Sequence, residues 1–167
     1  MPRLFALDHN FPQPIVDALA DFQSDAELVR ISEIDSRMAD LDDWEVLLAL
    51  HHHDREYDGL ITTDSSMLNL PRELSVLIQT RLTLVVAMES GDNPVKATGL
   101  LFAYLEGICQ RTEQTEAQVW RLAAANRPAL APWEQLVRVA DKRNVSVQEL
   151  FGENRLSIAD LGRNPLE

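Results

Sequence analysis

The chain has little of what several classes of protein require. It has a single cysteine, Cys109, in 167 residues, so it cannot form an internal disulfide. No run approaches the ~18 uncharged apolar residues of a membrane span, and residues 1–10 lack an apolar core long enough for a signal peptide. We therefore expect no membrane contact, a cytoplasmic location, and a Cys109 thiol that is buried in the run LLFAYLEGIC rather than nucleophilic.

Basic residues are scarce in the first part of the chain. Residues 1–110 hold 7 Lys and Arg against 19 Asp and Glu, whereas residues 111–167 hold 8 of each sign, so the net charge of −12 belongs to the first part. Phosphate binding is driven largely by Lys and Arg that replace counterions, and an acidic surface repels nucleic acid unless cations or basic groups offset it. Any nucleic-acid function must therefore explain this acidity.

Short apolar runs alternate with helical patterns through residues 1–110. Strands are predicted at 3–7, 27–32, 59–62 and 82–87, and helices at 10–20, 44–51, 71–78 and 93–109. This alternation predicts a doubly wound α/β fold with a mainly parallel sheet of about four strands. Beyond residue 110 the pattern favours helices alone, at 113–124, 132–142 and 147–151. We predict one α/β domain over 1–110 and a helical extension over 111–167 that packs on this domain or on a partner.

Three acidic side chains are predicted to meet at one edge of the sheet. Asp8 closes the first strand and Asp64 follows the third. Asp43 shares a helical face with Val46 and Leu47, which places it on the core side of the first turn of its helix. In open parallel sheets, ligands bind outside the carboxyl ends of the strands, where such a helix also begins. Any one of these residues alone is better explained as a helix cap or a turn residue, so the prediction rests on all three together.

Converging carboxylates repel one another and lose solvation, and a divalent cation relieves both costs. Mg²⁺ suits such a site because it takes a few carboxylates together with water and substrate phosphate oxygens. A metal held in this way stabilises in-line displacement at a phosphodiester. We therefore expect Asp8, Asp43 and Asp64 to be metal-ligating and catalytic, with Mg²⁺ or Mn²⁺ as the cofactor.

Three segments in register resemble the PIN-like nucleases, which are related to the VapC-type toxins. FALDHNFPQPIVDAL resembles their first strand ending in Asp-x-Asn before a proline-started helix, DDWEVLLAL their second acidic segment, and LITTDSSMLNL their strand ending in Thr-x-Asp. The resemblance covers residues 3–110. It implies a metal-dependent endoribonuclease, often the toxin of a toxin and antitoxin pair, with an RNA substrate and an antitoxin or other protein partner at the helical tail. The resemblance is also compatible with a homodimer.

The resemblance assigns Asp8, Asp43 and Asp64 as the metal ligands and Asn10 as a nearby polar support. Close relatives often carry a fourth acid where this chain has Ser66. A hydroxyl there can hold a water molecule but supplies no charge, and Glu89 at the end of the fourth strand is the candidate to compensate.

Other functions fit parts of the same pattern. A catalytically degenerate PIN-like protein-binding module is favoured by Ser66 and by the few basic residues near the site, for which Arg55, Arg72 and Lys96 are the candidates. A phosphoacceptor receiver-type domain is less favoured, because TLVVAM offers no lysine on the last predicted strand. LVRVADKRNVSVQELFG is faintly similar to the last helices of a Cro-type helix-turn-helix domain, which would read DNA.

Overall fold

The computed structural model describes the chain except for residues 12–15, 18–20, 22–24, 114 and 126. The strands are β1 (Arg3–Leu7), β2 (Ala26–Arg30), β3 (Gly59–Thr62), β4 (Thr83–Ala87) and β5 (Val119–Leu122). The helices are α2 (Ile31–Ile34), η1 (Ser36–Asp40), α3 (Asp43–His51), η2 (Ser65–Asn69), α4 (Pro71–Thr80), α5 (Pro94–Arg111), α6 (Pro132–Arg143), α7 (Val147–Asn154) and α8 (Ile158–Leu161).

All five strands form one parallel sheet in the order β2-β1-β3-β4-β5. The prediction of an α/β fold with a parallel sheet is confirmed, and the four predicted strands agree with β1 to β4 within two residues at each end. The predicted helix over 10–20 lies mainly outside the described residues. The other predicted helices of the first part correspond to α3, α4 and α5.

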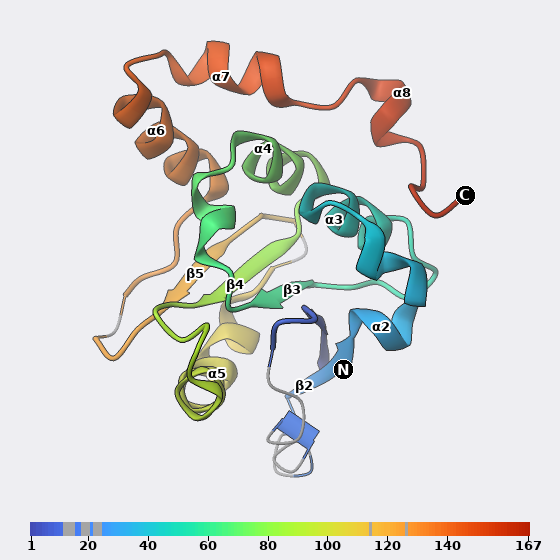
Figure 1. Cartoon of the computed structure of the whole chain (residues 1–167), viewed down its shortest axis with the longest axis vertical. Coiled ribbons are helices and arrows are strands. Elements are labelled where there is room, and N and C mark those ends of the chain that lie inside the picture. The colour runs from blue at the N-terminus through green and yellow to red at the C-terminus, as the bar shows by residue number, and fades with distance from the viewer. Residues whose placement is uncertain (12–15, 18–20, 22–24, 114, 126) are drawn as a thin grey trace.

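Helices cover both faces of the sheet, as Figure 1 shows, with α3, α4 and α6 on one side and α5 on the other. Side chains of a strand point alternately to the two faces. One face buries Leu4, Ala6, Leu60, Leu84 and Val119 against Leu47, Leu74, Leu77 and Leu136. The other buries Phe5, Leu7, Ile61, Val85 and Trp120 against Ala97, Leu101, Leu105 and Ile108. β1, β3 and β4 are therefore apolar on both faces, which explains their nearly continuous hydrophobic runs.

The helix predicted over 113–124 is wrong, and the count of four strands is wrong with it. Residues Val119–Leu122 form β5, which pairs with β4 from Leu84 to Ala87. Its backbone completes the hydrogen bonding of β4, because Leu84 N–H and Met88 N–H donate to the carbonyl groups of Gln118 and Leu122, each at 2.9 Å. The residues after 110 are therefore not all helical, and the α/β unit runs at least to Leu122.

Helices α6 and α7 pack on the α/β unit through α4 (Figure 1). Leu136, Val139 and Leu150 are buried in the same core as the sheet, and the Trp133 ring meets the Phe151 ring edge-on with centroids 5.5 Å apart. Gln79 of α4 ties down the chain after α7, donating to the Leu156 carbonyl at 3.0 Å and accepting its N–H at 2.9 Å. The extension thus packs on its own domain, and its buried apolar residues are not available to a partner.

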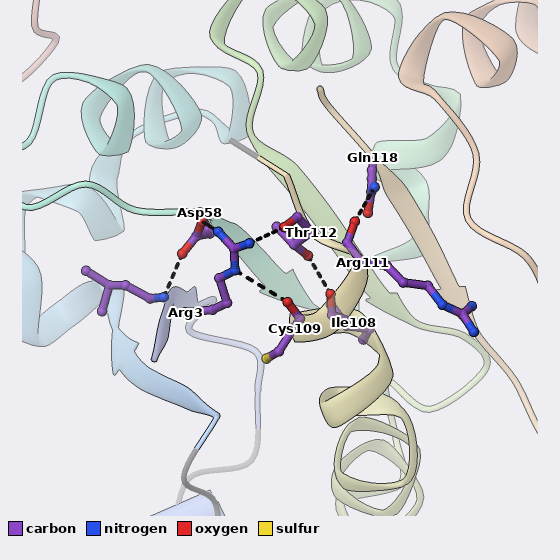
Figure 2. A network of polar contacts seen from close by, with 8 residues as sticks. Arg3, Asp58, Ile108, Cys109, Arg111, Thr112 and Gln118 are labelled. Atoms are coloured by element: carbon purple, nitrogen blue, oxygen red, sulfur yellow. Dashed lines mark hydrogen bonds and ion pairs between the residues drawn. The ribbon is translucent and has the colours of Figure 1, made fainter. Parts of the chain in front are cut away.

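A network around Arg3 joins the beginning of β1 to the end of α5 (Figure 2). The guanidinium group donates to Asp58 Oδ1 at 3.2 Å, to the Cys109 carbonyl at 3.4 Å and to the Thr112 carbonyl. Asp58 also accepts the Leu4 N–H at 2.8 Å. These contacts lie at the amino ends of β1 and β3, so they fix the edge of the sheet opposite to Asp8 and Asp64.

Gly59 lets β3 and β4 approach closely. It lies opposite Thr83 in the register of the two strands, and a Cβ atom at Gly59 would lie 1.9 Å from the Thr83 carbonyl oxygen. Only glycine fits without a shift of one strand.

In the described part of the chain, no helix combines the length and the hydropathy that crossing a bilayer demands.

Candidate active site

The site lies where the strand order changes direction along the sheet. β1 is followed in sequence by β2 on one side, whereas β3 lies on the other side of β1. Ligands of doubly wound folds bind at such a point, outside the carboxyl ends of the strands. Asp8 directly follows β1, and its backbone N–H donates to the Ile61 carbonyl of β3 at 2.9 Å. The ends of both strands, and the acids that follow them, are thereby held side by side.

Both carboxylate oxygens of Asp8 are held by hydrogen bonds. Oδ2 accepts the hydroxyl of Thr62 at 2.7 Å, and Oδ1 accepts the backbone N–H of His9 at 2.8 Å. The His9 Nδ1 atom is also 2.8 Å from Oδ1. Only 5% of Asp8 is exposed. A buried carboxylate needs such partners, and these fix its orientation before any ligand binds.

Asp64 begins the short helix η2 and is joined to Asp8 through Thr62. Its Oδ1 atom accepts the Ser66 N–H at 2.9 Å, which caps η2. Its own N–H donates to the Thr62 hydroxyl at 3.0 Å, the same hydroxyl that donates to Asp8. The capping role expected of an aspartate at such a turn is therefore present, and half-buried Asp64 still has Oδ2 without a hydrogen bond among the described residues.

Asp43 occupies the first turn of α3 and is half-buried there. Its neighbour Asp42 serves the helix end instead, because Asp42 N–H donates to Glu45 Oε2 at 2.9 Å. Burial raises the pKa of Asp43, the negative charges of Asp8 and Asp64 raise it further, and His9 opposes them. The three carboxylates, here called the acidic site, thus lie within electrostatic range of one another although they come from separate segments.

Glu73 is a fourth acid that the sequence analysis missed. It lies in the first turn of α4, where only 8% of it is exposed. Burial raises its pKa, its own backbone N–H lowers it, and the charge of Asp43 raises it. The signal was present, since Glu73 begins a helix at the same edge of the sheet as Asp43, but a glutamate in a first turn is ordinarily a helix-dipole partner.

The carboxylates of the acidic site suit a hard divalent cation, but their spacing limits how many of them can bind it directly. Among the described residues, no three Asp, Glu, His or Cys side chains stand close enough together to hold one ion. Mg²⁺ usually keeps several waters and takes one or two carboxylates directly. The acidic site therefore fits an ion held partly through water, and it does not fit an ion enclosed by protein ligands alone.

Of the predicted supporting residues, Ser66 contacts an acid of the site. Asn10 is exposed, and Ser66 contributes its backbone N–H to Asp64 rather than its hydroxyl. Glu89 is exposed with φ of 52°, and its carbonyl accepts the Lys96 ammonium at 2.9 Å.

The basic candidates named from the sequence each contact another group. Arg55 pairs with Glu27 at 2.7 Å, and Arg72 lies over the Trp44 ring at 5.4 Å from its centroid. Lys96 is held by the Glu89 carbonyl.

No protein-family model matches this chain, and no curated protein and no solved structure matches it significantly. The resemblance to PIN-like nucleases therefore stays a prediction, and the acidic site is the feature of the structure that indicates a function. At this site, Asp8 is buried and held at both carboxylate oxygens, and Thr62 joins it to Asp64. The charges of these two carboxylates act on Asp43 and help to raise its pKa.

Proposed function

We propose that the chain is a metal-dependent endoribonuclease of PIN-like type that hydrolyses phosphodiesters at the acidic site. The observation that carries the proposal is the meeting of three acids from separate segments: the Thr62 hydroxyl joins Asp8 to Asp64, and burial together with the charges of these two carboxylates raises the pKa of Asp43. A carboxylate whose charge is disfavoured by burial and by neighbouring acids costs stability, and groups perturbed in this way concentrate at functional sites.

The acidic site has a division of roles. Asp8, Asp43 and Asp64 would hold Mg²⁺ or Mn²⁺. When bound, this ion would act as a Lewis acid on the phosphate oxygens of the substrate. Thr62 and His9 keep Asp8 in one orientation, so Asp8 needs no reorganisation to act as a ligand. Asp64 has one oxygen tied to η2, which leaves the other for a ligand.

The neighbouring pair Asp43 and Asp42 provides a matched test. We expect Asp43→Asn to lower metal-dependent cleavage of single-stranded RNA by about 100-fold or more, the loss typical when one charged group of a transition-state site is removed. Asp42→Asn changes the same charge one residue away, on a side chain at the exposed helix end, and should retain cleavage. Equal cleavage by both variants would mean a contaminating nuclease or a different site.

Metal binding is measured separately from cleavage. A ligand that binds only the folded state raises the melting temperature in proportion to the logarithm of its concentration. Mg²⁺ and Mn²⁺ should therefore raise the melting temperature of the unaltered chain and of Asp42→Asn, but not that of Asp8→Asn or Asp64→Asn. An identical rise in all four proteins would remove the metal from the proposal.

The alternative is a catalytically degenerate PIN-like module that binds another protein. It is favoured by the absence, among the described residues, of any three side chains that could hold one ion, and by the exposed Ser66 and Glu89 where compensation was expected. This alternative predicts a melting temperature that does not respond to metal. The toxin role, with an antitoxin as partner, rests on the sequence resemblance alone, because Leu136, Val139 and Leu150 are covered by the domain itself.

A further inference from the structure

Basic side chains gather in a pocket beside the acidic site. The pocket has a volume of about 490 Å³ and lies between η2, β5 and α6. Four basic residues line it, Arg121, Arg127, Arg138 and Lys142, and we call it the basic pocket. Asp141 lines it as well, and the net charge of these five side chains is positive. None of the three arginines forms an ion pair within the described residues.

Two buried polar atoms of residues that line the basic pocket have no hydrogen-bond partner within the described residues. One is the buried Nε atom of Arg121, and the other is Oε1 of Gln135. Only 7% of Gln135 is exposed, and its Nε2 atom is fixed by a 2.8 Å bond to the Leu68 carbonyl. Buried polar atoms are nearly always paired, so an unpaired donor and an unpaired acceptor on residues beside this cluster of positive charge favour a ligand that brings both an anionic acceptor and a hydroxyl donor.

Electrostatics agree with this geometry. Burial lowers the pKa of Arg121, and the charges of Arg138 and Arg127 lower it further. Arginine remains charged all the same, so the basic pocket concentrates positive charge that its own residues do not neutralise. An anion would relieve this repulsion.

The basic pocket and the acidic site occupy the same edge of the sheet. Ser65, which lines the basic pocket, directly follows Asp64, and Met88, which also lines it, follows the last residue of β4. A strand of nucleic acid could therefore bridge the two sites along the carboxyl ends of β3 and β4. This placement also answers the objection raised by the acidic first part of the chain, because the basic groups come from the neutral second part.

We propose that the basic pocket binds a backbone phosphate and an adjacent ribose hydroxyl of single-stranded RNA, which holds a neighbouring phosphodiester at the acidic site. The identity of the ligand as RNA rests on the proposed function, whereas the anionic character of the ligand rests on the basic pocket alone. Binding would not depend on the base sequence, because a phosphate and a ribose hydroxyl belong to the backbone of the strand.

The test measures RNA binding without cleavage. A labelled single-stranded oligoribonucleotide is titrated in EDTA by fluorescence anisotropy at several salt concentrations. We expect Arg127→Ala and Arg138→Ala each to weaken binding about fivefold to tenfold and to lower the salt slope by about 1. Arg163→Ala is the control, because it removes the same charge from an exposed residue near the C-terminus. Figure 1 shows the C-terminus on the opposite side of the molecule from α6. If all three variants bind like the unaltered chain, the proposal is overturned.

Further arms separate this proposal from the nuclease proposal. Asp64→Asn should bind RNA in EDTA at least as tightly as the unaltered chain, whatever its cleavage, because it removes a negative charge beside the strand and leaves the basic pocket intact. RNA binding that depends on Arg138 in a chain that never cleaves supports the basic pocket and removes the nuclease. Cleavage that is insensitive to Arg127→Ala and Arg138→Ala retains the nuclease and overturns the basic pocket. Competition by inorganic phosphate as effective as that by RNA, or tighter binding of DNA of the same sequence, also overturns it, because neither ligand offers the ribose hydroxyl.

Discussion

The hydroxyl of Thr62 donates a 2.7 Å hydrogen bond to Oδ2 of Asp8 across the β1–β3 boundary. The same hydroxyl accepts the backbone N–H of Asp64 at 3.0 Å, so one buried side chain couples the two strand ends that carry acids. A threonine at the end of a strand is ordinary in sequence, because β-branched residues favour strands. Its position next to Asp8 depends on the strand order, which the sequence does not state.

Thr62→Val removes the hydroxyl at constant shape and leaves a buried carboxylate oxygen unsatisfied. Hydrogen bonds to charged groups contribute more than neutral ones, so we expect the free energy of unfolding to fall by about 2 kcal/mol. Thr62→Ser keeps the hydroxyl and should lose less. Urea unfolding followed by tryptophan fluorescence compares the two variants, and equal stability of both would show that the bond to Asp8 contributes nothing.

The raised pKa of Asp43 makes stability depend on pH. Its carboxyl group titrates above the ordinary value of 3.8 in the fold, so the folded protein loses stability as the pH rises through the window above 3.8. Asp43→Asn should therefore melt at a higher temperature than the unaltered chain at pH 7 in EDTA. The advantage should shrink below pH 3.8, where the carboxyl group is neutral in both states. An advantage of the same size at low pH would contradict electrostatic strain as its cause.

Gly59 and Gly99 should respond to alanine in opposite directions. In Gly59→Ala the new methyl group would meet the Thr83 carbonyl at 1.9 Å, so we expect a loss of about 3 kcal/mol or failure to fold. At Gly99, an exposed position in α5, nothing lies within 4 Å of the new atom, and alanine should stabilise the helix by about 0.5–1 kcal/mol. Thermal unfolding measures both, and a tolerated Gly59→Ala would contradict the close approach of β3 and β4.

The Cys109 thiol should react slowly in the folded protein. Burial, with a smaller contribution from the charge of Asp25, raises its pKa to about 11 from the ordinary 9.0. The thiolate is the reactive form, so labelling by a maleimide at pH 8 should be about 100-fold slower in the folded chain than in urea. Equal rates would show that the thiol is exposed. The sequence prediction of a buried thiol agrees with the structure, where 8% of Cys109 is exposed.

Much of the fold could be predicted from the sequence because the local signals are consistent. Strands buried on both faces give continuous apolar runs, and Asn93 with Pro94 marks the beginning of α5, where Asn93 Oδ1 accepts the Lys96 N–H at 3.0 Å. β5 could not be predicted, because Val119–Leu122 is short and is flanked by Glu, Gln and Ala, which favour helix. Pairing with β4 overrides that preference.

The acidic site could be predicted only in part. Asp8 and Asp64 follow from the ends of strands, and Asp43 follows from the apolar face of α3. Glu73 required knowing where α4 begins relative to the sheet. The basic pocket was beyond sequence analysis, because Arg121 belongs to the unpredicted strand and Arg138 to a helix whose position depends on α4.

β5 also determines how short the chain can be made. It covers the outer side of β4, whose Leu84 and Met88 N–H groups donate to Gln118 and Leu122. A fragment ending at residue 110 would expose that row of donors and acceptors, which is a template for pairing with the same strand of another molecule. Such a fragment should aggregate rather than fold as an autonomous nuclease, and the nascent chain on the ribosome faces the same hazard until β5 emerges.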